Sequence, residues 1–527
     1  MKVTMKLLIT IVITLVSVSL NAAEPKSIKA IDSYVESVME TFHVPGAAIG
    51  IIKDGEVVHM RGYGVADIEK GHAVDEFTIF KVASLTKAFT STSLAILVDQ
   101  EKMDWSDKVS THLPDFKMYD DYASQEFSVI DILTHRSGLG LGAGDLMLWP
   151  EPTKFTRKQL VKNLRYLKPA YGFRERYAYD NTLYIVAGEI AAAISGKEWE
   201  QHISDSIFKP LGMNHCYPGG VDTEKQPNVV APHLYMNGEI VVDQPNRIRP
   251  SSTLMAAAGG IKCSVHDLLI WMDVQLGLGT TSTGIELFSE KQARKMWYPV
   301  TPLSVSKIAR ELDDTHFRGY ALGWRANDYR GEWMISHTGT LSGAMAKLTL
   351  LPDSNLGLVV LINTSSGYAR SALTDGILQH FREDQSFDWL AYYKERRTKR
   401  QEWLASEEAQ AQGMVLPDEL KISNNRRTRK MLGTFRDPWF GKITLKREGD
   451  DVVFRSEMVP RMVGKVYRFA EDKNTWWVKW DNRSFEADSW LRFERKDGKL
   501  HLTMERIAED SDWSMDVQDL NFVKVRR

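Results

Sequence analysis

Cysteine is almost absent from this chain: its 527 residues include only Cys216 and Cys263. Two cysteines are too few for a disulfide scaffold or a cysteine-ligated metal site, although a single bridge between them stays open. An excess of one charge is also lacking, because 67 basic and 69 acidic side chains leave a net charge of -2. A chain without a basic surplus is not expected to bind nucleic acid.

The N-terminal residues are typical of a secretory signal peptide. Lys2 and Lys6 precede an apolar run from 7 to about 20, and the small residues Ala22 and Ala23 follow it. The run is shorter than the ~20 residues that a membrane span usually needs, and no cysteine lies near it to carry a lipid. We therefore predict a cleaved signal peptide over 1–23 and a mature protein secreted into a bacterial periplasm without a stable membrane anchor.

The rest of the chain divides into two parts with different patterns. From 24 to 385, the stretches "AAIGIIKDGEVVHMRGYGVADI" and "AKLTLLPDSNLGLVVLIN" predict hairpins, and helical runs lie between them. We expect an α+β domain, in which an antiparallel sheet is flanked by helices and joined by a helical subdomain. A charged helical linker over 386–417 and short alternating segments over 418–527 predict a second, all-β domain built as a small barrel.

A serine and a lysine lie three positions apart in "KVASLTKAFTSTSLAILVDQ". If a helix begins near Ser84, Lys87 lies one turn further along the same face, so the two side chains can meet. A serine hydroxyl needs a neighbouring base, and a partly buried lysine can serve if its pKa is lowered. The free backbone N–H at the helix start can stabilise an oxyanion.

Two later motifs carry matching chemistry. In "RYAYDNTLYIVAGEI", Tyr179 could pass protons and Asn181 could hold a substrate amide. In "WMISHTGTLSGAMAKLTLLP", an imidazole and a hydroxyl would face a cleft from a strand, where a glycine lets a substrate backbone lie close.

The three motifs, in this order and spacing, resemble those of the penicillin-recognising serine hydrolases. The tyrosine in the second motif resembles the branch that holds class C β-lactamases, D,D-peptidases and D-aminopeptidases. Segments such as "VPGAAIGIIKDGEVVHMRGYGVAD", "ILTHRSGLG", "AAGGIKCSVHDLLIWM" and "GYALGW" are similar to segments of the same family. The resemblance therefore covers the chain from 27 to about 381.

The resemblance implies a catalytic role for three residues. Ser84 would be the nucleophile that forms an acyl-enzyme, and Lys87 and Tyr179 would share proton transfer. The backbone N–H groups of Ser84 and Thr340 would form the oxyanion hole.

The resemblance also implies that Asn181, His337, Thr338 and Gly339 bind the substrate. One of them departs from the β-lactamase pattern, since His337 stands where lysine is usual. An unperturbed imidazole titrates near pH ~6.5 and carries only part of a charge at neutral pH. The departure argues against an efficient β-lactamase and favours the peptidase and esterase relatives.

No cofactor is implied by these motifs, and no metal ligand set is expected. His135, His215 and His266 do not form an H-E-x-x-H motif or a comparable pattern. The expected partner is a small-molecule or short-peptide substrate, and the oligomeric state is left open.

The C-terminal part resembles the lipocalin-like β domain that is appended to some of these hydrolases, on the stretch "LGTFRDPWFGKITLKREGDDVVFR". We expect its tryptophans to form the barrel core rather than a ligand pocket. They are Trp439, Trp476, Trp477, Trp480, Trp490 and Trp513.

Three functions remain in view. The first is an exported peptidase or amidase that acts through Ser84 on small D-amino-acid-containing or cell-wall-related peptides. The second is a carboxylesterase or weak class C-like β-lactamase with the same nucleophile. The third is a non-catalytic ligand-binding protein, which the intact set of motifs disfavours.

Overall fold

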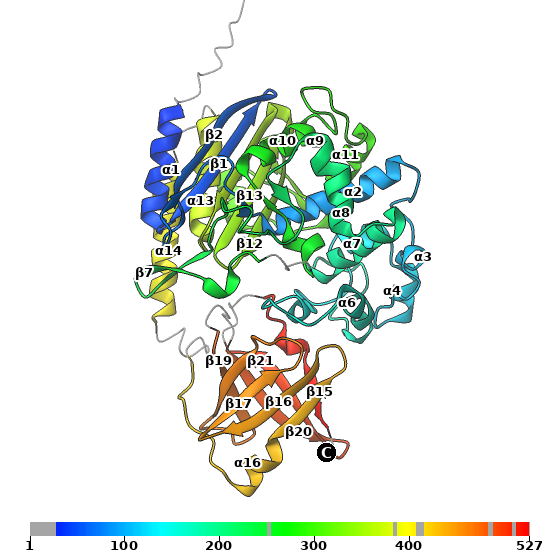
Figure 1. Ribbon diagram of the computed structural model, residues 1–527, viewed down its shortest axis with the longest axis vertical. Coiled ribbons are helices and arrows are strands. Elements are labelled where there is room, and N and C mark those ends of the chain that lie inside the picture. The colour runs from blue at the N-terminus through cyan, green and yellow to red at the C-terminus, as the bar shows by residue number, and fades with distance from the viewer. Residues whose placement is uncertain are drawn as a thin grey trace, which may run out of the picture.

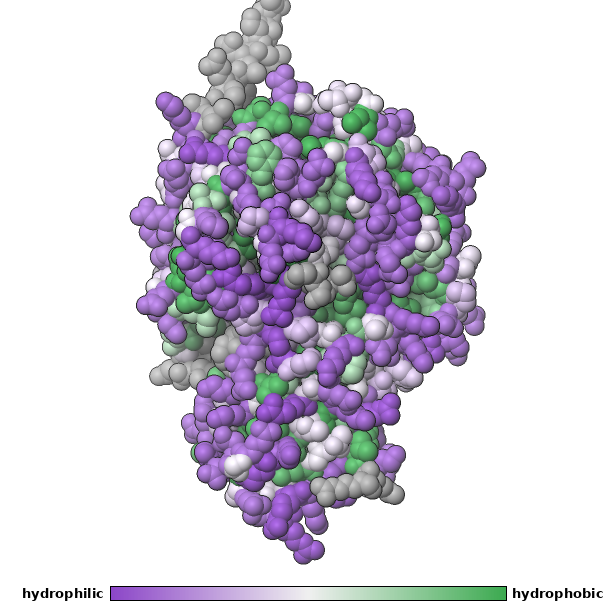
Figure 2. Space-filling model, in the orientation of Figure 1, coloured by the Kyte–Doolittle hydropathy of each residue, from purple (hydrophilic) through white to green (hydrophobic). Residues whose placement is uncertain are grey.

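The computed structural model describes residues 28–249, 254–382, 387–406, 416–482, 488–507 and 513–525. The predicted signal peptide lies outside these residues. Figure 1 shows a large mixed α/β part above a small barrel, and Figure 2 shows that both parts are largely hydrophilic on the face drawn. No helix among the described residues is long and apolar enough to cross a bilayer.

The large part is organised by an antiparallel sheet that contains nine strands within the described residues. Its first strand pairs with its last long strand, Ala47 opposite Ile362, so the two ends of the domain close one sheet as the two hairpins predicted. The strands, in spatial order, are β3 His72–Ala73, β2 Glu56–Asp67, β1 Gly46–Lys53, β14 Leu356–Ile362, β13 Ala344–Leu351, β12 Glu332–Leu341, β11 Arg325–Tyr329, β10 Arg318–Tyr320 and β9 Thr301–Pro302.

Helices cover both faces of this sheet, which explains why β1 is apolar almost throughout. Ile49 and Ile51 pack toward one helical layer, whereas Ala48 and Ile52 belong to the core on the other side. The first layer holds α1 Ile28–Phe42, α13 Gly367–His380 and α14 Trp389–Leu404, and α10 Val265–Leu276 contacts the opposite face.

The helical subdomain is built around α2 and α7, which contact each other (Figure 1). Almost every residue of α2 is buried, because other elements surround this helix. The helices of the subdomain are α2 Thr86–Asp99, α3 Val109–His112, α4 Asp121–Glu126, α5 Val129–Leu133, α6 Arg157–Asn163, α7 Thr182–Ser195, α8 Trp199–Ile203, α9 Lys209–Leu211 and α11 Glu290–Trp297. A further helix, α12 Lys307–Asp313, contacts the turn between β11 and β12, where the backbone N–H of Arg330 donates to the Asp313 carbonyl at 2.7 Å. The shorter helical turns are η1 Ala83–Leu85, η2 Asp145–Met147, η3 Leu164–Tyr166, η4 Ser204–Phe208, η5 Gln244–Asn246, η6 Ala256–Gly260 and η7 Pro352–Ser354.

Two small sheets complete this part. One joins β4 Phe80–Lys81, β8 Lys262–Cys263 and β5 Cys216–Tyr217, and the Cys216–Cys263 disulfide links its last two strands. The bridge that the sequence left open is therefore present. The other is a hairpin of β6 His233–Met236 and β7 Glu239–Val242.

The C-terminal part is a closed antiparallel barrel, which confirms the expected fold class together with the mixed domain. Trp439, Trp476 and Trp480 belong to its buried core, as predicted. Trp477 is also buried, but in a separate cluster with Tyr467 and Ile507 against which the half-buried Trp490 packs, so these two tryptophans depart from the prediction. The barrel follows α16 Arg426–Met431, and its strands are β15 Gly433–Asp437, β16 Gly441–Glu448, β17 Asp451–Ser456, β18 Val463–Arg468, β19 Thr475–Trp480, β20 Ser489–Lys496, β21 Lys499–Arg506 and β22 Asn521–Lys524, with η8 Val517–Asp519 before the last.

The barrel is docked against the helical subdomain through backbone and side-chain hydrogen bonds. The backbone N–H of Lys154 donates to the carbonyl of Met458 at 2.7 Å, and the Asn163 amide donates to the carbonyl of Trp439 at 2.7 Å. The two parts thus form one continuous apolar core.

Candidate active site

The predicted nucleophile lies at the turn that leads into α2. Ala83, just before Ser84, has φ +49°, a left-handed conformation that is unusual for a residue with a side chain. Ser84 is half-buried and lines a cleft of about 670 Å³. The same cleft is lined by Tyr179, Asn181 and Thr338, so the three motifs meet at one place.

Lys87 is the best candidate for the base. Its Nζ lies 3.2 Å from Ser84 Oγ and donates to Asn181 Oδ1 at 2.7 Å and to the Ala258 carbonyl at 2.8 Å. The side chain is fully buried, and it makes no ion pair with a described carboxylate. Burial lowers the pKa of Lys87 from 10.5 to about 7, although the charge of Asp145 opposes the shift. A large fraction of this amine is therefore neutral near pH ~7 and can accept the serine proton.

Tyr179 stands on the other side of the nucleophile. Its hydroxyl shares a hydrogen bond with the Ser84 side chain, and the Lys87 Nζ lies 4.7 Å from its ring centroid. Burial raises the pKa of Tyr179 well above 10, so the phenol keeps its proton in the resting site. This state suits a group that relays a proton to a leaving group, while Lys87 begins the reaction as the base.

Asn181 links the lysine to a carboxyl group that the sequence motifs did not reveal. Its Oδ1 accepts from Lys87, and its Nδ2 donates to Asp145 Oδ2 at 2.8 Å. These bonds fix the amide orientation and leave one N–H for the acyl-side carbonyl of a substrate. Burial and the charge of Asp516 raise the pKa of Asp145 well above its usual range.

His337 does not lie among the residues that line the cleft. Its ring is 1% exposed, with Nε2 2.9 Å from the Tyr320 hydroxyl and Nδ1 2.7 Å from the Thr338 carbonyl oxygen. Burial, followed by the positive charges of Arg325 and Lys87, lowers the pKa of His337 well below 6.5. The imidazole is thus neutral at physiological pH, which contradicts the expectation of a partly charged substrate contact.

Arg325 supplies the cation that the third motif lacks. It starts β11 opposite Ser336 of β12, and its Nη1 donates to Thr338 Oγ1 at 3.2 Å. The guanidinium carbon lies 6.0 Å from the centroid of the Tyr179 ring. Arg325 lines the cleft and stays charged, so this end of the cleft suits a carboxylate. No motif spacing identifies it, because its position depends on the pairing of two strands.

Gly339 fits against the nucleophile segment itself. A Cβ atom there would lie 2.2 Å from the Val82 carbonyl oxygen and 3.1 Å from the Ala83 Cβ. The glycine therefore lets β12 approach η1, and its contact with a substrate stays a prediction. This contact brings the segments of Ser84 and Thr340 together, whose N–H groups are the predicted oxyanion hole.

The barrel also contributes to the cleft, which the sequence did not indicate. Trp513 lines the cleft, and its ring lies 5.3 Å from that of Tyr179, edge to face. Asp516 is buried and accepts from the backbone N–H groups of Gly144 at 2.5 Å and Leu146 at 3.1 Å. These bonds fix η2, which carries Asp145. Trp513 is accordingly an exception to the prediction that the barrel tryptophans form its core.

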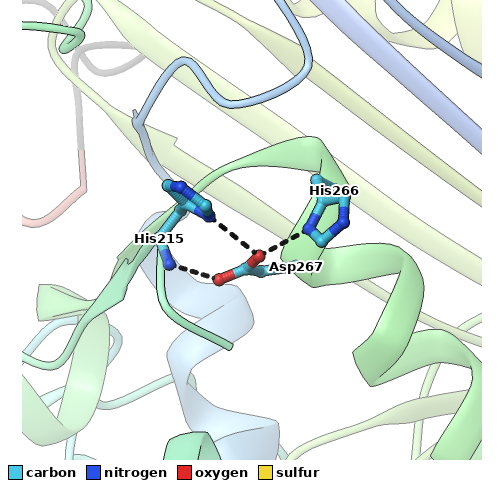
Figure 3. A group of neighbouring side chains, drawn as sticks. All are labelled: His215, His266 and Asp267. Carbon is cyan, nitrogen blue, oxygen red and sulfur yellow. Dashed lines mark hydrogen bonds and ion pairs between the residues drawn. The ribbon is translucent and has the colours of Figure 1, made fainter. Parts of the chain in front are cut away.

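Three possible metal ligands meet away from the cleft lining (Figure 3). His215, His266 and Asp267 each offer one ligand atom, and these atoms lie within 4.8 Å of one another. The sequence pattern around His215 and His266 predicted no metal ligand set. The carboxylate of Asp267 already accepts from the backbone N–H of His215 at 2.5 Å, and its Oδ1 lies 2.8 Å from Nδ1 of His266. These bonds account for the cluster as a link between the start of α10 and the residue directly before β5.

The sequence and the fold were compared with known proteins. The family model described as Beta-lactamase matches residues 31–380. "Unguisins hydrolase ungD'" of Aspergillus campestris is 26% identical over 382 residues, which cover 68% of this chain and 67% of the relative. "Protein flp" of Staphylococcus aureus strain COL is 27% identical over 376 residues, or 69% of each chain.

Two solved structures share the fold. An octameric penicillin-binding protein homologue from Pyrococcus abyssi aligns with a TM-score of 0.59 at 21% identity and covers 95% of this chain and 100% of its own. A class C beta lactamase from Rhodobacter sphaeroides aligns with a TM-score of 0.54 at 22% identity and covers 67% of this chain and 99% of its own.

Proposed function

Because this chain belongs to the beta-lactamase family of serine hydrolases, we propose that it is an exported peptidase or amidase that forms an acyl-enzyme on Ser84. Its substrates are small D-amino-acid-containing or cell-wall-related peptides. The observation that carries the proposal is the 3.2 Å approach of the Lys87 amine to the Ser84 hydroxyl. The burial that lowers the pKa of Lys87 to about 7 makes this amine a usable base.

The reaction follows from these positions. Neutral Lys87 takes the proton as Ser84 Oγ attacks the substrate carbonyl, and the N–H groups of Ser84 and Thr340 stabilise the oxyanion by about 3 kcal/mol each. Tyr179 passes its proton to the leaving amine as the bond to the acyl carbon breaks, and protonated Lys87 returns a proton to Tyr179. Water then attacks the acyl-enzyme and gives its proton to neutral Lys87, and this proton returns to Ser84 Oγ as the acid is released.

Arg325 supports a substrate with a free carboxylate at its leaving-group end. The guanidinium and the Thr338 hydroxyl it contacts can bind a carboxylate together. A peptide cleaved next to its C-terminal residue presents such a group. The preference for D-residues rests on the family resemblance.

The same cation favours a second candidate, a weak class C-like β-lactamase, because penicillins also carry a carboxylate. A carboxylesterase would use the same nucleophile and base. The buried lysine beside Ser84 argues against a non-catalytic binding protein, since an uncompensated buried amine destabilises a fold that gains nothing from it.

Labelling of Ser84 tests the proposal directly. We expect mass spectrometry to show a covalent adduct after treatment with a penicillin or a fluorophosphonate, and no adduct on Ser84→Ala. Ser93→Ala is the matched control, because Ser93 is a buried serine of α2 whose hydroxyl donates to the Thr90 carbonyl. An unlabelled wild type would support the binding-protein alternative, and turnover of D-alanyl peptides, nitrophenyl esters and nitrocefin would rank the hydrolases.

Arg325→Met tests the direction in which the substrate binds. We expect kcat/KM for a peptide with a free C-terminal carboxylate to fall by about 10- to 100-fold relative to its C-terminal amide, the scale of one charge-assisted contact. Arg325→Lys should keep part of the preference. An equal loss for acid and amide would show that Arg325 does not bind the carboxylate.

Export is supported by the N-terminal pattern and by the Cys216–Cys263 disulfide, since such bridges persist in oxidising compartments. N-terminal sequencing of protein isolated from the periplasm of a bacterial host should find that residues 1–23 have been removed.

A further inference from the structure

Two lysines oppose each other on the short ladder between β4 and β8. Lys81 and Lys262 are direct cross-strand partners, so their side chains leave the ladder side by side. Like charges in this position repel each other and destabilise a strand pair. Lys262 is only 5% exposed, which strengthens the repulsion because water does not screen it.

Neither ammonium group has a carboxylate partner in the described part of the chain. The Lys81 Nζ donates to the Asn246 carbonyl, and the Lys262 Nζ donates to the Gly219 carbonyl at 2.7 Å. Burial lowers the pKa of each lysine to about 8, so both remain mainly protonated at neutral pH. The negative charge of Glu151 opposes this shift at both lysines, so one carboxylate faces two ammonium groups. Buried charges that are only partly balanced are costly, and a further anion would lower that cost.

Both lysines line a cavity of about 140 Å³ that adjoins the catalytic cleft. Trp149, Thr340 and Ser514 line the cavity and the cleft alike, so the two spaces are neighbours along the end of β12.

Charges of both signs surround Lys81, and the two carboxylates act on it more strongly than the two arginines. Arg249 and Arg461 lower the pKa of Lys81, whereas Glu151 and Asp243 raise it. The carboxylate of Asp243 is engaged by the hydroxyl of Ser342 at 2.5 Å and by the amide of Asn246 at 2.8 Å. Glu151 alone therefore offers a carboxylate to the cavity among the residues that line it.

If the leaving group binds at Arg325 and Thr338 as proposed, the cavity lies on the acyl side of the nucleophile. Thr338, which Arg325 contacts, marks the leaving-group end of β12, and Thr340 and the residues after it lead to the lysines. We propose that Lys81 and Lys262 form a subsite for a carboxylate on the acyl part of the substrate. This inference rests on the proposed function and defines its substrate class: compounds with one carboxylate beyond the leaving group and a second on the acyl side.

Mono-4-nitrophenyl esters of adipic and suberic acid test the subsite, because the released phenol is the same for each acid. The matched neutral substrates are the methyl esters of their free carboxyl groups, and Ser84→Ala gives the background. We expect wild-type kcat/KM to favour the free acid by at least about tenfold at one of the two lengths. The acid-to-ester ratio should fall toward one in Lys262→Gln and in the Lys81→Gln/Lys262→Gln double variant. Lys102→Gln, which changes an exposed lysine just after α2, should keep the wild-type ratio.

A binding measurement tests the lysine subsite without requiring catalysis, so it distinguishes this proposal from the proposed hydrolase function. Adipate should raise the thermal unfolding temperature of Ser84→Ala, and this shift should be lost when Lys262→Gln is added. Equal kcat/KM for acid and ester in the wild type, or an undiminished ratio in the double variant, would overturn the subsite and leave the serine hydrolase standing. Hydrolysis of both esters that does not depend on Ser84 would instead refute the proposed function, and the adipate shift would still test the lysines.

Discussion

The rate of acylation should follow the ionisation of Lys87. Only the neutral amine can accept the Ser84 proton, and burial places the pKa of Lys87 at about 7. The neutral fraction is then roughly one half at pH ~7, about a tenth at pH ~6 and about a hundredth at pH ~5. We expect kcat/KM for a neutral ester to fall about tenfold per pH unit below pH ~6.5 and to level off above pH ~8.

Folding stability should not cause this loss. The unfolded lysine has a pKa of about 10.4, so the stability linked to Lys87 is present above that value and is lost as pH falls toward about 7. Below the folded-state pKa both states hold the proton, and Lys87 adds no further destabilisation. The thermal unfolding temperature, measured across the same pH range, shows whether activity is lost because the protein unfolds in acid or because Lys87 becomes protonated.

Arg325→Met tests whether the pH profile of kcat/KM reports the ionisation of Lys87. The positive charge of Arg325 helps to lower the pKa of Lys87, so its removal should move the midpoint of the profile to higher pH. Arg325→Lys keeps a charge and should leave the midpoint nearer to that of the wild type.

The assay is the release of 4-nitrophenol from its acetate between about pH 5 and 9, with Ser84→Ala as the background. A neutral substrate is needed because Arg325 is also the proposed carboxylate contact. A flat profile below pH ~7 would refute Lys87 as the base, and a midpoint that does not rise in Arg325→Met would refute the electrostatic coupling.

Three further outcomes are expected. Lys87→Ala and Tyr179→Phe should each reduce kcat/KM by at least about a hundredfold. The loss of kcat/KM in the double variant should be much smaller than the product of the two single losses, because the two residues share one proton path. Losses that multiply fully in the same kinetic assay would contradict this. Gly339→Ala should lower the unfolding temperature, because its Cβ would lie 2.2 Å from a carbonyl oxygen, whereas Gly367→Ala, which meets nothing within 4 Å, should change it little. Trp513→Ala should change the ranking of acyl groups in a panel of nitrophenyl esters, and an unaltered ranking would show that the barrel does not shape specificity.

Local sequence pattern predicted most of the candidate site. Ser84 and Lys87 are one helical turn apart, so their spacing alone predicts that they meet, and Tyr179 and Asn181 stand directly before an apolar helix. The fold class was also predictable, since the hairpins have strong turn signals and the barrel strands alternate regularly.

Local sequence pattern did not predict the residues whose positions depend on tertiary contacts. Arg325 reaches the cleft only because β11 pairs with β12 in one register, and no spacing along the chain encodes that register. The ionisation of His337 depends on its burial beside Tyr320, which a sequence does not display. No local pattern distinguishes Lys81 or Lys262 from other lysines, because their proximity depends on the pairing of β4 with β8.

Because Trp513 lines the cleft and Asp516 holds η2, changes in the barrel and changes in the mixed domain affect the same site. An insertion or deletion in the connection between β21 and β22 would act as an active-site mutation, although it lies at the far end of the gene from the codon for Ser84. Exchange of this barrel for another module would remove one wall of the cleft and the carboxylate that holds Gly144 and Leu146. Selection on substrate preference can therefore act on the C-terminal barrel as well as on the three sequence motifs.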